Sequence, residues 1–455
     1  MLRLIQTVLR ASGFVACIAL AALPFSAGAN SVLEWNETAF RITVAGGQNP
    51  IVLSRTVAMM HLAVHDALNA IDRRYEPYLH DVGLPPQSGA AEAADAAVAA
   101  AAHGVLGGVA SSWGSDEQRA QALTVLEQSY AAALARIAEG EARQRGLAIG
   151  AAAARSMLEA RKSDGSGVRP TYAPQQGAGR WRPHPNPVPA NPPIADPAMA
   201  VGNWPALQPQ WATLTPFTMV TAWQFRLPGP PDLASPAYAR DFDEVKRLGG
   251  AAGSERTEEQ SAIARYWYEG SPQGWSRIAR IVAAERGLDR WESARLLALV
   301  NVVIADGYVA GADTRYHFDR WRPVTAIREA ADDGNDSTMP DPSWHSYLNT
   351  PPLPDYPSTH SVAGGAAAVV LARFFGDDAV AFTMTSGPPF PGLTRSFRSF
   401  SEAARENGDS RVYAGVHFRS ACVDGVALGE RIGRRAFAHF LRPAQEWQAA
   451  GLRQR

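Results

Sequence analysis

Apolar residues recur at helical spacing along most of the chain. Between residues 54 and 77 they fall every three or four positions and stop before Pro77, which predicts a helix. The positions concerned are Val57, Met60, Val64, Leu68 and Ile71. Residues 89–110 are rich in alanine, the strongest helix former, and a further helical pattern ends near Arg161.

Several helix starts are marked by side chains that can satisfy the first free backbone N–H groups. Ser115–Gln118 forms a capping box that opens a helix through about Ala138, and Thr257–Gln260 forms a second. Ser235 is a candidate N-cap that is followed by proline in the first helical position. Further helices are expected at 235–248, 274–286, 289–313, 363–375 and 424–441. With no strand series and no repeat of fixed period, the predicted fold class is all-α, two packed helical bundles.

Residues 164–235 interrupt the helical pattern with dense proline and glycine. Disordered linkers are poor in aromatic residues, so the tryptophans of this segment indicate that it wraps on the surface of the folded body. They are Trp181, Trp204, Trp211 and Trp223. The predicted organisation is a signal peptide over 1–29, an N-terminal helical region over 30–163, this connecting segment over 164–235, and a C-terminal helical region over 236–455.

The first 29 residues have the pattern of a secretory signal. Arg3 and Arg10 give a positive start, residues 14–25 form an apolar stretch, and residues 27–29 read Ala-Gly-Ala, a small-residue cleavage site. We therefore expect a secreted or periplasmic protein cleaved near Ala29, with an uncleaved N-terminal anchor as the alternative. No other uninterrupted apolar run approaches the ~20 residues of a membrane-spanning helix.

Charge and cysteine content narrow the range of partners. The 43 basic and 44 acidic side chains give a formal net charge of −1, which argues against a nucleic-acid or membrane-surface footprint. Loss of the signal would remove Cys17 and leave Cys422 alone, so no intramolecular disulfide is expected.

Three short segments of the C-terminal region concentrate arginine, serine and histidine. They are 315–323 (RYHFDRWRP), 357–360 (PSTH) and 410–417 (SRVYAGVH). Guanidinium groups bind phosphate-like oxygens through paired charge-assisted hydrogen bonds. An imidazole can attack as a nucleophile or move a proton near neutral pH. The set indicates an enzyme with one site for a tetrahedral oxyanion.

These segments resemble the signature of the superfamily that unites vanadium-dependent haloperoxidases and type 2 phosphatidic acid phosphatases. That signature runs Lys-x6-Arg-Pro, Pro-Ser-Gly-His and Ser-Arg-x5-His, in the order found here. Similarity extends to four stretches outside the motifs: HDALNAIDRRYEP from His65, WRPHP from Trp181, TPF from Thr215 and SPAYARDFDEVKRLG from Ser235. The chain looks like the bacterial haloperoxidase-like branch, and the resemblance implies the same helical architecture with catalysis in the C-terminal region.

The resemblance also implies a role for each matching residue. His417 would bond to vanadium or, in a phosphatase, attack phosphorus, and His360 would be the general acid–base partner. The expected cofactor is vanadate, with His417 as the metal ligand; a phosphatase would need none. The oxyanion would be held by Arg315, Arg322, Ser358, Thr359 and Arg411.

Several positions depart from the family pattern. Arg315 replaces lysine, and Thr359 replaces glycine. Ala421 stands where the family has an aspartate that orients the catalytic imidazole, and Asp424 could substitute for it or cap a helix. The halide-side tryptophan and phenylalanine of fungal chloroperoxidases are replaced by Ala312 and Leu353.

Other histidines are expected to be structural. His61 and His65 lie four residues apart beside Asp66, a spacing that could hold a metal. No third ligand block accompanies them, so a buried helix face is favoured. His317 lies within the first motif but away from Arg315 by helical spacing, and we expect it to pack.

Three functions remain open on these observations. A vanadate-dependent haloperoxidase would oxidise halide with hydrogen peroxide, the metal acting as a Lewis acid. An acid phosphatase would hydrolyse a phosphate ester through a phospho-His417 intermediate. A catalytically silent oxyanion-binding homologue is suggested by Thr359 and Ala421. Length and similarity outside the motifs favour the haloperoxidase, with small-molecule substrates, no nucleic acid, no membrane span in the mature chain, and a homodimer as an open assembly.

Overall fold

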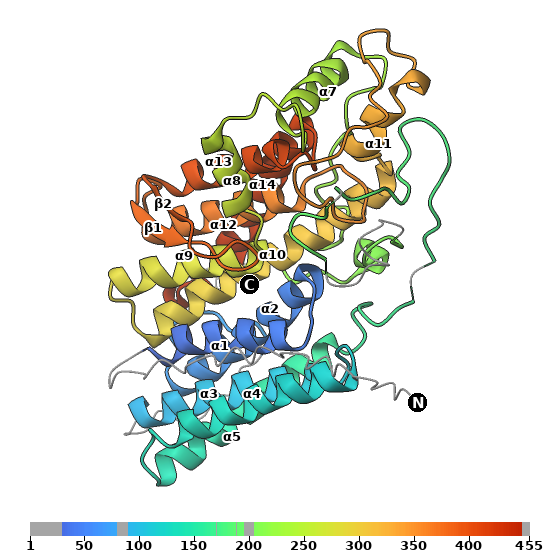
Figure 1. Cartoon of the computed structure of the whole chain (residues 1–455). Helices are drawn as coiled ribbons and strands as arrows, with labels where there is room; N and C mark the ends of the chain where they lie inside the picture. The colour runs from blue at the N-terminus through green and yellow to red at the C-terminus, as the bar shows by residue number, and fades with distance from the viewer. Residues whose placement is uncertain (1–29, 80–89, 170, 188, 195–203, 448–455) are drawn as a thin grey trace, which may run out of the picture.

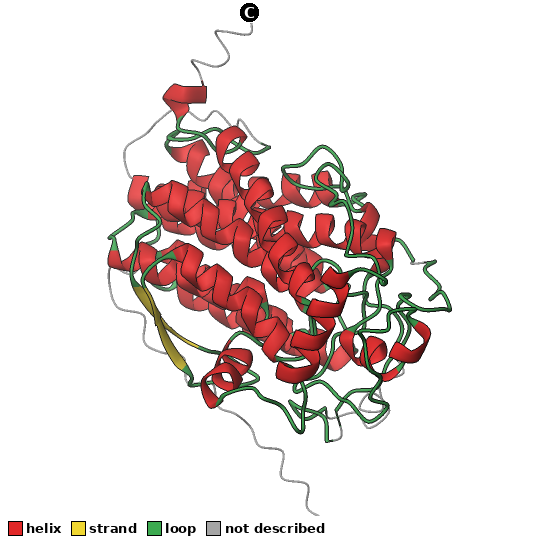
Figure 2. Cartoon of the chain, turned by 90° about the horizontal axis from the view of Figure 1, so that it is seen from above, coloured by secondary structure: helices red, strands yellow, loops and turns green. Residues whose placement is uncertain are grey.

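The computed structural model describes residues 30–79, 90–169, 171–187, 189–194 and 204–447. The predicted signal peptide lies outside the described residues. Helices dominate this part of the chain, as Figure 2 shows, and the predicted all-α fold class is confirmed.

The N-terminal helices form one layer of the molecule (Figure 1). They are α1 (Ser31–Ala45), α2 (Pro50–Ile71), α3 (Ala90–Ala110), α4 (Asp116–Leu134) and α5 (Glu141–Arg161). Helix α3 packs against both α2 and α5. The sequence did not predict α1; the other four lie within a few residues of their predicted positions.

The C-terminal elements lie above this layer in Figure 1. The helices are α7 (Pro236–Leu248), α8 (Glu258–Tyr266), α9 (Ser271–Glu285), α10 (Arg290–Phe318), α11 (Pro323–Arg328), α12 (Thr359–Phe375), α13 (Phe400–Tyr413) and α14 (Arg419–His439). Two short 3-10 helices, η1 (Pro209–Thr213) and η2 (Ala330–Asp332), lie in connections. One antiparallel hairpin, β1 (Phe382–Thr385) and β2 (Thr394–Phe397), pairs Phe382 with Phe397. The sequence analysis missed this hairpin, α11 and α13.

The predicted capping signals hold at three helix starts. Reciprocal capping boxes open α4 at Ser115 and α8 at Thr257. The Ser235 side chain accepts a hydrogen bond from the Tyr238 N–H at the start of α7. Because each cap involves residues only three positions apart, the sequence alone predicted the first residues of α4, α7 and α8 correctly.

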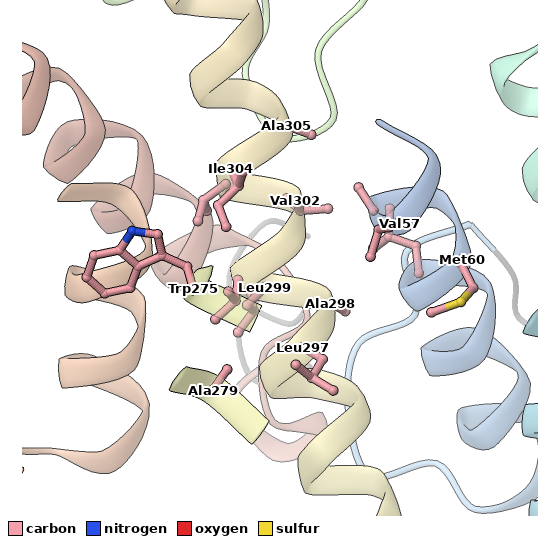
Figure 3. Packing of buried hydrophobic residues seen from close by; sticks show 14 of the residues in the cluster. Val57, Met60, Trp275, Ala279, Leu297, Ala298, Leu299, Val302, Ile304 and Ala305 are labelled. Atoms are coloured by element: carbon pink, nitrogen blue, oxygen red, sulfur yellow. The ribbon is translucent and has the colours of Figure 1, made fainter. Parts of the chain in front are cut away.

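Helix α10 is the centre of the molecule. It is 29 residues long, begins with a capping box at Asp289, and is buried continuously from Ser293 to Arg315. A helix that is apolar on all sides must be covered on all sides. Figure 3 shows Ala298 and Val302 of α10 directed towards α2, while Ile304 points towards Trp275 of α9. Helix α10 therefore joins the two helical layers.

Acidic residues of α10 hold the connecting segment against the body. Both oxygens of the Asp306 carboxylate accept backbone N–H groups, from Phe217 and Thr218, each at 2.7 Å. One turn from the end of the helix, Asp313 binds the Arg226 guanidinium through two hydrogen bonds, of 2.6 and 2.7 Å. The segment is thus fixed on the helix that leads into the first motif.

The tryptophans of the connecting segment are mostly covered, as expected. Trp181 is fully buried and Trp211 is 2% exposed, whereas Trp223 is 56% exposed. The packing expected for Trp223 is therefore wrong, since it lies on the surface.

Helices α12 and α14 approach so closely that their backbones touch. A Cβ on Gly365 would lie 2.3 Å from the Val426 carbonyl oxygen, and one on Gly429 would lie 2.0 Å from that of Val362. No residue larger than glycine fits at either position without moving a helix. This contact fixes the start of α12, which carries the second motif, against the start of α14.

Three helices are long and apolar enough to cross a bilayer by length and composition alone: α2, the Ala93–Ala110 part of α3, and α10. The sequence analysis looked for uninterrupted apolar runs and so did not single out these helices, which reach the requirement by mean hydropathy although polar residues interrupt them. Within this fold the apolar window of α10 is entirely buried by protein, and that of α2 is 89% buried.

The expectation for His61 and His65 is confirmed. They are 0% and 1% exposed, and burial lowers the pKa of His61 to about 3 and that of His65 to about 4. His61 contacts the Asn36 amide at 2.7 Å. Among the described residues no group of three metal-binding side chains occurs.

We predict that replacing Asp306 with alanine destabilises the protein strongly. The change leaves the N–H groups of Phe217 and Thr218 and the Thr218 hydroxyl without their acceptor, at about 1–3 kcal/mol for each buried group. Urea unfolding should report a loss of several kcal/mol in the free energy of unfolding. The matched control is Asp313→Ala, which should lose less because its partner Arg226 is one-third exposed and regains water. Equal losses of unfolding free energy in the two variants would contradict the view that the buried backbone contacts of Asp306 are the more important ones.

Candidate functional site

The three motif arginines come from different helices and are all buried. Arg315 lies in the last turn of α10, Arg322 is the N-cap of α11, and Arg411 lies in the last turn of α13. Their exposed fractions are 2%, 0% and 1%. Arginine is almost never fully buried without a partner, so three together indicate a site built for negative charge.

Arg322 is held by two loops. Its Nε donates to the Leu353 carbonyl and its Nη1 to the Val416 carbonyl, each at 2.6 Å. Nη1 also lies 3.0 Å from Nε2 of His417. Within the part of the chain that the structure describes, Nη2 has no hydrogen-bond partner. Its N–H groups are therefore free to hold a ligand.

Arg315 and Thr359, two of the departures from the family pattern, contact each other. Nη2 of Arg315 donates to the Pro357 carbonyl at 2.7 Å and to the Thr359 hydroxyl. A glycine at position 359 would offer no such acceptor. The guanidinium is tied to the start of α12, and its Nε has no hydrogen-bond partner among the described residues.

Arg411 is held by an aromatic ring rather than by polar groups. Its guanidinium lies 5.4 Å from the ring centroid of Tyr268, a cation–π contact. Neither Nε nor Nη1 has a hydrogen-bond partner in the described part of the chain. The Tyr268 hydroxyl donates to the Asn349 carbonyl at 2.6 Å, which fixes the ring.

Ser358 is both an N-cap and part of the pocket wall. Its Oγ accepts from the Ser361 backbone N–H at 3.4 Å and from the Ser361 hydroxyl at 3.0 Å. Its own N–H donates to the Ala421 carbonyl at 2.9 Å, which ties α12 to α14. A hydroxyl that accepts twice still has one hydrogen to donate. The N-terminus of α12 adds favourable field for an anion.

His417 is 3% exposed and contacts a carboxylate that the sequence analysis did not consider. Its Nδ1 lies 2.9 Å from Oδ1 of Asp355, which is 1% exposed. Among the described residues that oxygen accepts no hydrogen bond, so the imidazole does not direct an N–H at it in this orientation. Asp424, the substitute considered for orienting His417, instead accepts the Tyr356 hydroxyl at 2.7 Å. Among the described residues, the carboxylate within ion-pair distance of His417 is that of Asp355.

His360 follows Ser358 and Thr359 in the first turn of α12. Its Nε2 lies 3.2 Å from the Glu269 carbonyl oxygen. A carbonyl can only accept, so Nε2 carries the hydrogen and, in the neutral ring, Nδ1 is left to accept a proton. The Glu269 side chain is itself paired with Arg277.

The electrostatics agree with a shared cationic pocket. Burial lowers the pKa of Arg315 to about 10 and that of Arg322 to about 9, so both remain protonated at neutral pH. Burial, followed by the charges of all three arginines, lowers the pKa values of His417 and His360 well below the ordinary range. Burial raises the pKa of Asp355 to about 7, and the charge of Arg322 opposes that rise. Charges that act on the same two imidazoles must lie close together.

The structure therefore brings all seven predicted site residues into one region, and it adds Asp355 and Tyr268. A signal for Asp355 was present: it is a charged residue that follows Pro354 and lies two positions before the second motif. Ala312 and Leu353 are both buried. His317 differs from expectation, because it is exposed and packs only edge-on against Phe318.

The residues present fit a tetrahedral oxyanion. Among the described residues, four guanidinium nitrogens in the three arginines lack a hydrogen-bond partner although they are buried. Buried N–H groups without partners are costly, and an oxyanion supplies the missing acceptors. These nitrogens are Nε of Arg315, Nη2 of Arg322, and Nε and Nη1 of Arg411.

Comparisons with known proteins cover both helical layers. A model of the N-terminal domain of vanadium chloroperoxidase (VCPO) matches residues 25–213, and a model of the VCPO second helical-bundle domain matches residues 295–446. The vanadium chloroperoxidase of Curvularia inaequalis is 28% identical over an alignment that covers 42% of this chain and 42% of that protein. The match thus spans less than half the length of this relative.

Solved structures show the same fold. A bacterial vanadium-dependent iodoperoxidase superposes with a TM-score of 0.71 and 24% identity, covering 91% of this chain and 97% of that one. An apo-type bacterial vanadium-dependent chloroperoxidase gives 0.71 and 21%, covering 86% and 94%. The holo-type form gives 0.70 and 21%, covering 86% and 92%.

We predict that Arg315 and Thr359 are energetically coupled in anion binding. Arg315→Lys and Thr359→Gly each remove the hydrogen bond between them, so the double variant should lose less affinity for inorganic phosphate than the two single losses added together. The coupling should be about 0.5–3 kcal/mol, measured by calorimetric titration of the four proteins. A control cycle pairs Arg315→Lys with Thr338→Ala, whose hydroxyl contacts Asp333 instead, and should be additive. Additivity in both cycles would contradict the prediction.

Proposed function

Because the chain belongs to the vanadium haloperoxidase family, we propose that it is a vanadate-dependent enzyme that oxidises halide with hydrogen peroxide. Both domain models that match are those of vanadium chloroperoxidase, and together they include the N-terminal layer and the three motifs. The similar solved structures are haloperoxidases that depend on vanadium. Small-molecule substrates, peroxide and a halide, follow from this proposal.

The observation that carries the proposal is the set of unpartnered arginine N–H groups beside His417. Vanadate and phosphate share charge and tetrahedral shape, so the same donors serve either anion. His417 would be the ligand that bonds to the metal, and Arg315, Arg322, Arg411, Ser358 and Thr359 would surround the oxygens. Bound vanadate would supply a Lewis acid that polarises peroxide oxygen without changing its oxidation state.

The protein's own contribution is positioning and proton transfer. The arginines are fixed by carbonyl groups, by Thr359 and by the Tyr268 ring before any ligand arrives, so little reorganisation is needed on binding. Neutral His360, with its Nε2 hydrogen directed to Glu269, presents Nδ1 as the acceptor for a proton from peroxide. The exclusion of water by this buried site strengthens each of these interactions.

Two contacts among the described residues speak against a catalytically silent homologue. The two departures that suggested a silent homologue, Thr359 and Ala421, both have a counterpart in the structure. Thr359 accepts a hydrogen bond from Arg315, and a carboxylate from Asp355 lies beside His417. An acid phosphatase that uses the same pocket is tested by the same experiment.

We predict that His417→Ala abolishes halide oxidation by the vanadate-loaded protein. The arginines remain, so the variant should still bind inorganic phosphate weakly. His360→Ala should reduce turnover by about 10²–10⁴-fold, the usual contribution of a general acid–base group. The assay supplies vanadate, bromide and hydrogen peroxide, with a phosphate ester in parallel.

Near-normal bromide oxidation by the His417→Ala protein would contradict the proposal that His417 holds the vanadate of a haloperoxidase. Turnover of the phosphate ester without any bromide or iodide oxidation would favour the phosphatase instead. An inert protein that still binds both anions would favour the silent homologue.

We also propose that the protein is exported, with cleavage near Ala29, and that the mature chain has no membrane span. The support is the charged start, the apolar stretch and the small-residue site of the first 29 residues. We predict that N-terminal sequencing of protein from its source begins near Asn30. Soluble cytoplasmic protein that keeps Met1 would contradict this, and light scattering of the same sample distinguishes a monomer from a homodimer.

A further inference from the structure

A buried carboxylate lies in a site otherwise suited to anions. Asp355 is 1% exposed, and its Oδ1 lies 2.9 Å from Nδ1 of His417 and 3.9 Å from Nη1 of Arg322. Its backbone N–H donates to the Arg320 carbonyl at 2.8 Å, which fixes its place in the loop before α12. A negative charge here opposes the binding of an oxyanion, so its presence calls for a compensating role.

The third motif lacks the aspartate that would orient His417, and the position of the Asp355 carboxylate can compensate for this. The residue four after His417 is Ala421, whose methyl group cannot form a hydrogen bond with an imidazole. Asp424 is also unsuitable, because its carboxylate is engaged by the Tyr356 hydroxyl at 2.7 Å. Within the described residues, the carboxylate that lies within ion-pair distance of His417 is that of Asp355.

We propose that Asp355 is the positioning residue that orients the His417 imidazole, in place of the aspartate that the family carries at the position of Ala421. The orienting carboxylate has thus moved from the start of α14 to the loop that precedes α12. This inference rests on the proposed function, because it assigns His417 the role of metal ligand.

The chemistry requires a particular tautomer of the ring. A metal ligand must present a nitrogen lone pair, and the other nitrogen must then carry the hydrogen. A carboxylate that accepts from Nδ1 would hold the hydrogen there and leave the lone pair on Nε2; the 2.9 Å separation of Nδ1 and Oδ1 of Asp355 is close enough for this once the ring turns to face that oxygen. Nη1 of Arg322 can only donate, and it lies 3.0 Å from Nε2 and 3.3 Å from Nδ1 of His417, so its shorter contact is with Nε2.

A competing explanation is that Asp355 only balances the charge of the buried arginines. The two explanations differ in what removal of the charge does to different anions. Vanadate would bond to the imidazole, whereas inorganic phosphate is held by the arginines alone. Loss of orientation should therefore weaken vanadate binding selectively, while loss of a balancing charge should not weaken the binding of either anion.

The test compares inorganic vanadate and inorganic phosphate on the full-length protein by calorimetric titration. We expect Asp355→Asn, which keeps the shape of the side chain, to weaken vanadate binding by about 10–100-fold, the usual cost of losing a partner behind a metal ligand. Phosphate affinity should stay the same or rise, because a negative charge leaves the pocket. Asp424→Asn is the matched control, a neighbouring carboxylate with a different partner, and should change neither affinity.

A second readout needs no bound metal. In protein with ¹⁵N-labelled histidine, the His417 signals of the ligand-free wild type should report a hydrogen on Nδ1. Asp355→Asn should shift them towards a mixture of tautomers, and Asp424→Asn should leave them unchanged. Thermal unfolding of each variant checks that the fold is retained.

The outcomes separate this inference from the proposed function. If the wild type binds vanadate no better than phosphate, the proposed function fails. If the wild type prefers vanadate and Asp355→Asn keeps that preference with the same tautomer, Asp355 does not position His417. An equal loss of both affinities would also overturn the inference, because it would show general support of the pocket.

Discussion

The burial of three positively charged guanidinium groups is the constraint on which the rest of this structure depends. Moving such a group out of water is costly unless hydrogen bonds replace the lost hydration. Arg322 receives two backbone carbonyls, Arg315 a carbonyl and a hydroxyl, and Arg411 the face of Tyr268. These partners lie between residues 268 and 416, far apart in sequence, so the site forms only when the C-terminal helices and the loops between them are in place. The unpartnered N–H groups that remain define what the pocket can bind.

The departures from the family motifs make physical sense in pairs. Arg315 in place of lysine brings a guanidinium, which has more N–H donors than an ammonium group. Thr359 in place of glycine supplies a hydroxyl that accepts from one of them. Ala421 in place of aspartate removes a carboxylate, and Asp355 places one beside the same histidine. Without Thr359 the Arg315 guanidinium would lose one acceptor, and without Asp355 no carboxylate among the described residues would lie within ion-pair distance of His417. A motif is thus better understood as a set of contacts than as a set of positions.

Sequence reasoning succeeded where the deciding interaction is local. The capping boxes at Ser115 and Thr257 involve residues three apart, and they gave the starts of α4 and α8 correctly. It missed α13, whose sequence contains glycine, asparagine and serine that favour helices weakly, although that helix carries Arg411. It also missed the hairpin, because strands of four residues are too short to show a period. The contact between Asp355 and His417 joins two loops that are far apart in sequence, and a local sequence pattern cannot predict such a contact.

The arginines also repel one another, and this gives the anion a second role. The charges of Arg315 and Arg411 both act to lower the pKa of Arg322, after the larger effect of burial. Asp355 offsets part of this repulsion, but it lies beside His417 and leaves the unpartnered N–H groups unsatisfied. An oxyanion among those groups would supply both negative charge and acceptors at once. Part of the affinity for such an anion would therefore come from repulsion and unmet hydrogen bonding that exist before it binds, because packing of α10, α11 and α13 keeps the three arginines in place.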